Sequence, residues 1–364
     1  MRPWLKRKFA MECEQMSIQG PCLIVANHVT NWDPLLLTVC SPETPVYFIA
    51  SEHLFRHGLL SRLVEWVAQP ISRSKGTVAS DTVKAALRHL KAGHAVAVFA
   101  EGDATWDGRS AAVFPATGKL AKLSGGSLIT FRLEGGYLSL PRWGHGVRRG
   151  WMRGHPVHVY SPEELKTMKA EEVTAAINRD IREDAWQRQR TRPVNYRGRR
   201  LAEGMETGLF LCPGCERFGT LRTEDDRIFC ACGFTRRYTE RGFFEPGEPF
   251  ESFAEWEDWQ QKSLRERVFP SGETLFSDGE VSLAQICPGH REHRLGRGTL
   301  LQEADTLRFG SLRFPLKEIG GMALVKSQRL LFTHGDNYYE CRGAGRANFR
   351  KYLSLWKIFK EKEQ

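Results

Sequence analysis

Two residues near the start of the chain have the types and spacing of a general base and the acid that orients it. They are His28 and Asp33, five positions apart. An imidazole can take a proton from an alcohol near neutral pH, and a carboxylate on one ring nitrogen leaves the other nitrogen available as the base. The same pair could be a turn histidine and a helix cap, and the spacing alone does not separate the two interpretations.

The surrounding residues predict a strand, a turn and a helix. The apolar run at 23–26 is typical of a short buried strand. Asp33 precedes Pro34 and three leucines, which predicts a helix start with Asp33 as N-cap and Pro34 at the first helical position. His28 should then lie on the strand-to-helix turn, beside backbone N–H groups that can bind an anion.

The sequence from Asn27-His28 to Asp33-Pro34 resembles the first motif of the phospholipid/glycerol acyltransferase family, which includes the lysophosphatidic acid acyltransferases. Further motifs follow in the family's order over roughly the first half of the chain. Residues 69–76 resemble the second motif, whose arginine is matched by Arg73. A guanidinium fits phosphate and Lys75 could add a point charge, so we expect both to hold an acceptor phosphate; a solvated basic loop is the alternative.

The segment after the apolar run 95–100 resembles the third motif. The resemblance implies that Glu101 organises the acceptor side and that the Gly102 backbone helps to hold the phosphate. The matching residues are Phe99, Glu101, Gly102, Asp107 and Gly108.

Three residues depart from the third motif: Ala100 replaces a proline, Asp103 a threonine and Ala104 an arginine that helps to hold the phosphate. Losing a cation and gaining an anion should weaken phosphate binding unless another cation compensates. The candidates are Arg73, Arg109 and Lys119.

Composition limits the class of protein. The chain has 364 residues, of which 41% are hydrophobic and 11% aromatic, which is enough for two or three globular domains. The net charge of +10 suits anionic lipid, nucleic acid or an acidic carrier and does not choose among them. No apolar run reaches about 18 residues, so we expect no membrane-spanning helix. Residues 1–20 are either an interfacial segment that inserts Trp4, Leu5 and Phe9, or an ordinary solvated helix.

Apolar periodicity predicts the other elements of the first half. Strands are expected at 45–50, 95–100, 127–133 and 156–160, and helices at 52–67, 80–90 and 171–190. The arginine-rich run 188–200 is expected to be a linker or a basic patch, with solvated surface as the default interpretation.

Four of the nine cysteines have the spacing of a zinc ribbon: Cys212, Cys215, Cys230 and Cys232. Four thiolates complete a tetrahedral shell, so we expect structural Zn²⁺. A ribbon can also bind nucleic acid or protein, although nucleic acid is not the partner we expect. The other cysteines are scattered, which suits a reducing cytosol better than a disulfide framework.

The last part of the chain alternates short apolar runs with Gly and Asp turns, which is typical of strands. Strands are expected at 299–301, 306–309, 312–314, 323–325, 329–332 and 338–341, followed by a helix at 347–360. This pattern loosely resembles a pleckstrin-homology-like barrel. Cys287, His290 and His293 lack a fourth metal ligand and are expected to lie in loops.

We therefore expect an α/β fold with a mixed sheet flanked by helices, which is the glycerolipid acyltransferase fold, then a four-cysteine zinc ribbon and a small β-rich domain with a C-terminal helix. The expected boundaries are 1–190 for the acyltransferase domain, 191–208 for a basic linker, 209–245 for the ribbon and 246–364 for the β-rich, pleckstrin-homology-like domain.

The resemblance implies a glycerolipid O-acyltransferase of phospholipid synthesis, with His28 and Asp33 as the catalytic pair. It would move a fatty acyl group from acyl-CoA or acyl-carrier protein to the hydroxyl of a lysophospholipid, with 1-acylglycerol-3-phosphate as the first acceptor to consider. The expected location is the cytoplasm, peripherally on the membrane surface.

Two alternatives stay open. A retired acyltransferase scaffold could act as a lipid- or nucleic-acid-binding regulator, which the altered third motif and the added ribbon favour. An active enzyme could also use an acceptor without phosphate, such as an amine or a sugar. The sequence leaves the acceptor, acyl chain length, donor and oligomeric state open.

Overall fold

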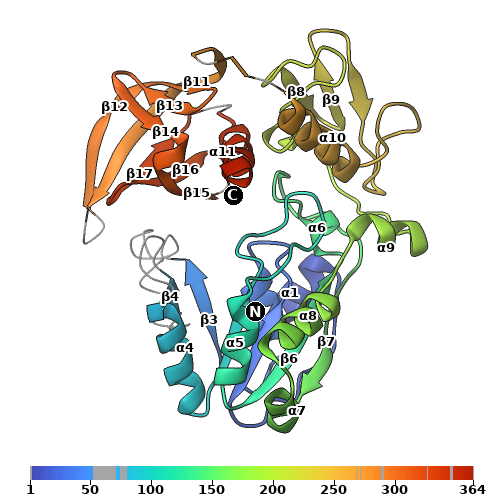
Figure 1. The fold of residues 1–364 in the computed structure, drawn as a ribbon. Coiled ribbons are helices and arrows are strands. Elements are labelled where there is room, and N and C mark those ends of the chain that lie inside the picture. Colours follow the sequence, from blue (N-terminus) through green and yellow to red (C-terminus); the bar gives the residue numbers. More distant parts are fainter. Residues whose placement is uncertain are drawn as a thin grey trace. The chain divides into compact units, whose positions relative to one another are not determined.

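The computed structural model describes residues 2–51, 71–73, 80–267, 269–270, 272–287, 291–325, 327–344 and 347–363 (Figure 1). The chain divides into two compact units. The first comprises Met1–Arg142, Gly146–Gly198 and Glu240–Gly242, and the second Trp143–His145, Arg199–Thr239 and Phe243–Gln364. None of the described helices has both the length and the apolar character needed to cross a membrane.

The first unit is built on a mixed seven-stranded sheet of order β1-β7-β6-β2-β5-β3-β4. Strand β2 pairs in parallel with β5 and β6, β3 pairs in parallel with β5 and β4, and β7 runs antiparallel to β6. The expected mixed α/β sheet is confirmed. The strands are β1 (Met11–Cys13), β2 (Cys22–Ala26), β3 (Val46–Ser51), β4 (Ile71–Arg73), β5 (Ala95–Phe99), β6 (Ser127–Glu134) and β7 (Met152–Tyr160).

Helices cover both faces of this sheet, which is why every residue of β2 is buried. Ile24 belongs to a core with Leu5 and Leu36, whereas Val25 on the opposite face packs in a core with Leu90. The helices are α1 (Arg2–Phe9), α2 (Asp33–Val39), α4 (Ser80–Lys91), α5 (Ala116–Leu123), α6 (Gly136–Ser139), α7 (Pro162–Thr167), α8 (Ala170–Asp180) and α9 (Ala185–Thr191). The helix expected at 52–67 lies outside the described residues.

The helix expected at 171–190 is two helices, α8 and α9, so that prediction is wrong in one respect. The chain turns because Asp180 is buried and accepts hydrogen bonds from Thr130 and Tyr160. Asp184 then caps α9 by accepting from two backbone N–H groups. Arg188 is not solvated as expected: it is largely buried and lies 2.7 Å from Glu183.

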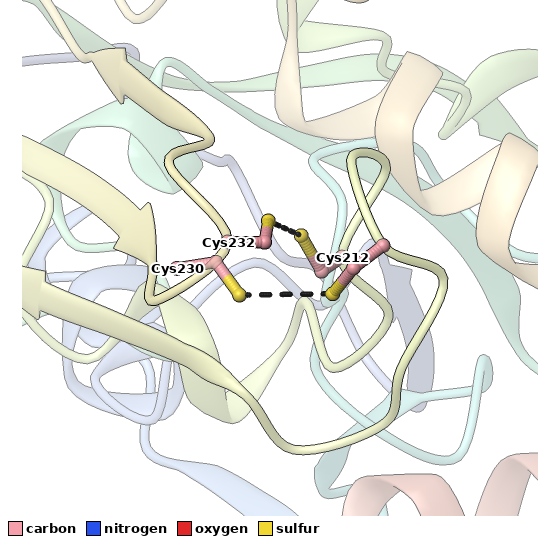
Figure 2. A group of neighbouring side chains, drawn as sticks. Cys212, Cys230 and Cys232 are labelled. Atoms are coloured by element: carbon pink, nitrogen blue, oxygen red, sulfur yellow. Dashed lines mark hydrogen bonds between the residues drawn. The ribbon is translucent and has the colours of Figure 1, made fainter.

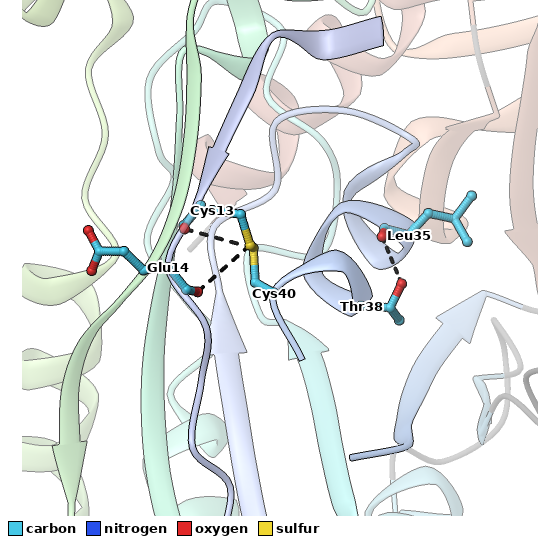
Figure 3. Close-up of a disulfide and its surroundings, with 6 residues drawn as sticks. Cys13, Glu14, Leu35, Thr38 and Cys40 are labelled. Carbon is cyan, nitrogen blue, oxygen red and sulfur yellow. Dashed lines mark hydrogen bonds between the residues drawn. A yellow bond between two sulfur atoms is a disulfide. The ribbon is translucent and has the colours of Figure 1, made fainter. Parts of the chain in front are cut away.

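Cys13, at the end of β1, and Cys40, at the end of α2, form a disulfide (Figure 3). The segment after β1 runs beside the end of α2, and the Met16 N–H donates to the Cys40 carbonyl at 2.8 Å. This contact brings the two thiols together. Cys13 and Cys40 are therefore paired, whereas the sequence predicted only scattered cysteines outside the ribbon.

The second unit contains a small three-stranded antiparallel sheet and one helix. The elements are η2 (Met205–Thr207), β8 (Leu221–Glu224), β9 (Arg227–Cys230), β10 (Thr235–Arg237) and α10 (Phe253–Glu266). Trp256 of α10 is fully buried, and its indole N–H donates to the carbonyl of Leu211, beside the first cysteine of the ribbon.

A second seven-stranded sheet of this unit has the antiparallel order β14-β13-β12-β11-β17-β16-β15, and a helix follows it. Strand β11 lies in the middle and pairs with β12 and β17. The expected β-rich region with a terminal helix is confirmed. The elements are β11 (Thr274–Cys287), β12 (Arg291–Glu303), β13 (Thr306–Phe309), β14 (Leu312–Pro315), η4 (Leu316–Glu318), β15 (Ile319–Val325), β16 (Arg329–His334), β17 (Asn337–Arg342) and α11 (Arg350–Glu363).

The long hairpin β11–β12 was largely missed in the sequence. Polar and glycine residues interrupt its alternation, and the pairing shifts register between Asp278 and Val281. Cys287 and His293 therefore lie on strands and not in loops, which corrects the prediction for these two residues. His290 lies outside the described residues.

Candidate functional site

His28 and Asp33 lie together at the carboxyl end of β2. Nδ1 of His28 is 2.7 Å from Oδ2 of Asp33. Because a carboxylate accepts, Nδ1 carries the hydrogen and Nε2 keeps a lone pair. The His28 ring stacks on Phe99 with 4.8 Å between centroids, and about a fifth of the His28 side chain is exposed. The geometry is that of an oriented imidazole with one nitrogen free to act as a base.

The Asp33 carboxylate is fully buried and organises the turn that carries His28. It accepts from the Val29 N–H at 2.6 Å, from the Thr30 N–H at 3.0 Å and from the Thr30 hydroxyl at 2.7 Å. These donors, with the imidazole, offset the cost of burying the charge. Asp33 is not the N-cap that the sequence predicted: the helix begins at Asp33 itself, after Trp32, and the carboxylate turns back to the loop.

Glu101 holds the backbone of His28. The parallel neighbours β2 and β5 end at the same edge of the sheet, so the residues that follow them meet. One Glu101 oxygen accepts from the His28 N–H at 2.8 Å and the other from the Ala111 N–H at 2.7 Å. Burial raises the pKa of Glu101 to about 7, although the two N–H donors oppose the shift. The Thr105 N–H also donates to the His28 carbonyl at 2.9 Å.

Gly102 is required by its surroundings. Its φ is +84°, and an added Cβ would lie 2.6 Å from the Phe114 ring. A larger residue would therefore strain this turn through its positive φ and push aside the exposed Phe114 ring. Arg73 ends β4, at the sheet edge where β2 and β5 also end, because β2, β5, β3 and β4 all run in parallel. The side chain of Arg73 and the whole of Lys75 lie outside what the structure describes.

Two ion pairs at the third motif were not found from the sequence. Arg142 lies 2.6 Å from Asp103, donates to the Ala104 carbonyl at 2.8 Å and packs 4.3 Å from the Trp106 ring centroid. Nε of Arg109 lies 2.7 Å from Asp107. An extra carboxylate in this loop was a signal that a cation must lie nearby, but nothing in the sequence identified Arg142.

The four ribbon cysteines converge on one point, as Figure 2 shows for the labelled residues. Their sulfur atoms all lie within 4.8 Å of one another, with Cys212 3.7 Å from Cys232 and Cys215 3.8 Å from Cys230. Cys212 and Cys215 come from the loop before β8, and Cys230 and Cys232 from the end of β9. This cluster of thiols is compatible with a bound metal ion.

A known family model matches the part of the chain that carries this site. The family model "Acyltransferase" matches residues 8–134. The crystal structure of the 1-acyl-sn-glycerophosphate (LPA) acyltransferase PlsC from Thermotoga maritima is similar to 53% of this chain and 75% of its own, at 16% identity and a TM-score of 0.40. A search of curated proteins gives no significant match. Residues 8–134, the part of the chain that matches the acyltransferase family model, contain the His28–Asp33 pair, Glu101 and Gly102.

Proposed function

We propose that the first unit transfers a fatty acyl group from an acyl thioester, acyl-CoA or acyl-carrier protein, to the hydroxyl of a lysophospholipid, with 1-acylglycerol-3-phosphate as the first acceptor to test. The observation that carries the proposal is the 2.7 Å contact between Nδ1 of His28 and the buried carboxylate of Asp33. The family match over residues 8–134 supports acyl transfer as the reaction class.

The reaction follows from this geometry. Nε2 of His28 removes the proton of the acceptor hydroxyl while the hydroxyl oxygen attacks the carbonyl carbon of the thioester. The resulting imidazolium is stabilised by Asp33, which keeps the ring in place. When the tetrahedral intermediate collapses, the C–S bond breaks and His28 returns the proton to the leaving thiolate. A C–O ester bond replaces the thioester, and no covalent bond to the protein is needed.

The acceptor phosphate is proposed to lie at the edge of the sheet where β2, β5 and β4 end. Arg73 and Lys75 would supply the positive charge, and the backbone around Gly102 would add N–H donors. Glu101 would act through His28 by fixing its backbone, because both carboxylate oxygens accept from main-chain N–H groups. It is therefore a positioning residue in this proposal.

The cluster of four cysteines is proposed to hold structural Zn²⁺. Four protein sulfurs complete the tetrahedral shell and leave no position for a substrate. The Arg217 side chain lowers the pKa of Cys215 to about 6, whereas burial raises the pKa of Cys212 to about 12, so metal binding should release protons from the thiols that are still protonated. We assign no step of acyl transfer to this site. The seven-stranded domain that follows is proposed to be pleckstrin-homology-like.

The lipid acceptor places the protein at a membrane surface, and we infer peripheral attachment at the cytoplasmic side. The decisive test measures thiol release from an acyl thioester with a panel of lysophospholipids, comparing the wild type with His28→Ala. We expect turnover with at least one acceptor and a loss of about 10²–10⁴ in kcat in the variant. A wild type no faster than His28→Ala on every acceptor would favour the retired scaffold instead.

A further inference from the structure

Large apolar side chains gather around the catalytic loop. Among the described residues, six large apolar side chains are substantially exposed, and two of them lie on the helices next to the catalytic turn: Trp4 on α1, whose ring centroid is 6.1 Å from that of Trp32, and Leu35 on α2. Trp4 is 53% exposed and Leu35 38%. Scattered exposed apolar residues need no explanation, but their concentration at one site of a protein marks a surface that contacts something apolar.

Helix α1 is a fixed platform and not a free arm. Leu5 and Phe9 are buried in the core of the first unit, and a guanidinium nitrogen of Arg2 donates to the Pro42 carbonyl at 2.7 Å. Of the two interpretations of residues 1–20, the one in which Leu5 and Phe9 insert into a membrane with Trp4 is therefore wrong for Leu5 and Phe9. Since the opposite face of the helix is anchored, its outer residues hold a constant position relative to α2.

The outer residues of α1 are basic. Arg2, Lys6, Arg7 and Lys8 are the charged residues of the helix, and it contains no acid. Nζ of Lys8 lies 4.5 Å from the Trp4 ring centroid and 4.4 Å from that of Trp32, close enough for attraction to both rings. Trp32 immediately precedes Asp33, so this cluster of rings and cations adjoins the catalytic turn.

We propose that Trp4, Lys6, Arg7, Lys8 and Leu35, the α1–α2 face, bind the surface of an anionic lipid bilayer. Tryptophan and leucine favour the interfacial region, and each nearby lysine or arginine is attracted to anionic headgroups. A soluble acidic protein would match the charge but would leave Trp4 and Leu35 unexplained. The inference extends the proposed function, because binding through this face would bring His28 to the surface that holds the lipid acceptor.

The test is sedimentation of the full chain with phosphatidylcholine vesicles that contain or lack phosphatidylglycerol. We expect binding only to the anionic vesicles, with affinity about tenfold weaker for Trp4→Ala and at least about tenfold weaker for the double variant Lys6→Glu/Arg7→Glu. The matched controls are Val159→Ala and Lys91→Glu/Lys166→Glu. They change exposed residues that lie toward the end of the sheet where β5 and β6 begin, away from the His28 turn, and they should bind as the wild type does.

Several outcomes would overturn the inference. They are binding that survives both α1 variants, control variants that weaken binding as much, equal binding to neutral vesicles, and capture of an acidic carrier protein without any vesicle binding. This readout needs no turnover, so it separates the two proposals. Trp4→Ala should also keep wild-type turnover of a water-soluble, short-chain acceptor and lose it with an acceptor embedded in anionic vesicles.

Discussion

The Asp103 carboxylate lies 2.6 Å from Nη1 of Arg142, so the anion that departs from the third motif is neutralised by a cation from a distant part of the sequence. Arg142 is 7% exposed, whereas about half of the Asp103 side chain is exposed. The guanidinium also binds the carbonyl of Ala104, at the position where the motif's own arginine is missing. The pair therefore places positive charge near this loop but offsets it with the added carboxylate.

Replacing Asp103 should strengthen binding of a phosphate-bearing acceptor. In Asp103→Thr the local charge increases by one, and solvent screening of the exposed carboxylate limits the effect to about twofold to fivefold in KM. The measurement compares KM for a lysophosphatidate with KM for monoacylglycerol, which should not change. Glu163→Gln, an exposed substitution on α7, is the control. Equal changes for both acceptors would mean that the loop, and not its charge, was altered.

Replacing Asp33 by Asn should impair both activity and stability. The amide has one acceptor oxygen and one donor nitrogen, and the nitrogen would face N–H or O–H groups that now donate to the carboxylate. We expect kcat to fall by about 10² or more, and the free energy of unfolding to fall by about 1–3 kcal/mol. His28→Ala should lose activity with a much smaller change in urea unfolding. An Asp33→Asn variant with wild-type kcat would contradict the role of Asp33.

The catalytic pair could be predicted because it lies in one short segment between a strand and a helix. The contact of Glu101 with the backbone of His28 could not be predicted, because it depends on β2 and β5 being neighbours in the sheet. Arg142 lies in a segment without helix or strand periodicity, so only its contact with Asp103 reveals it. In the second unit, Gly279 and Glu280 interrupt the alternation of β11, which hid a strand that the register shift accommodates.

Glu101 should make stability depend on pH. Its folded-state pKa of about 7 lies above the ordinary value of 4.5, mainly because of burial. As pH rises, Glu101 therefore loses its proton in the unfolded chain before it does so in the folded protein. The stability that the protonated Glu101 contributes is complete below about pH 4.5 and is lost as the pH approaches 7. The free energy of unfolding of the wild type, measured relative to Glu101→Gln, should fall between about pH 5 and 7 and then level off. A pH-independent difference would show that Glu101 titrates normally.

The same variant should slow turnover. The single amide oxygen of Gln at position 101 can accept from only one of the two N–H groups of His28 and Ala111. The other N–H would then face the amide NH2 group, which is also a donor. We expect kcat to fall about tenfold with little change in acceptor KM, because the effect acts through the position of His28 and not through substrate contact. A rise in KM at constant kcat would instead place Glu101 against the acceptor.

The ribbon should depend on a metal ion for its structure. Cys230→Ser removes one sulfur of the cluster, and we expect loss of a bound zinc measured by elemental analysis. Phe234, two residues after Cys232, packs on Trp256 with 5.3 Å between ring centroids, so loosening of the knuckle should extend to α10. Hydrogen exchange should therefore increase over residues 209–237 and 253–266. Cys287→Ser, outside the cluster, is the control. Zinc loss without faster exchange would contradict a structural role, because the ion would then contribute nothing to the packing that surrounds it.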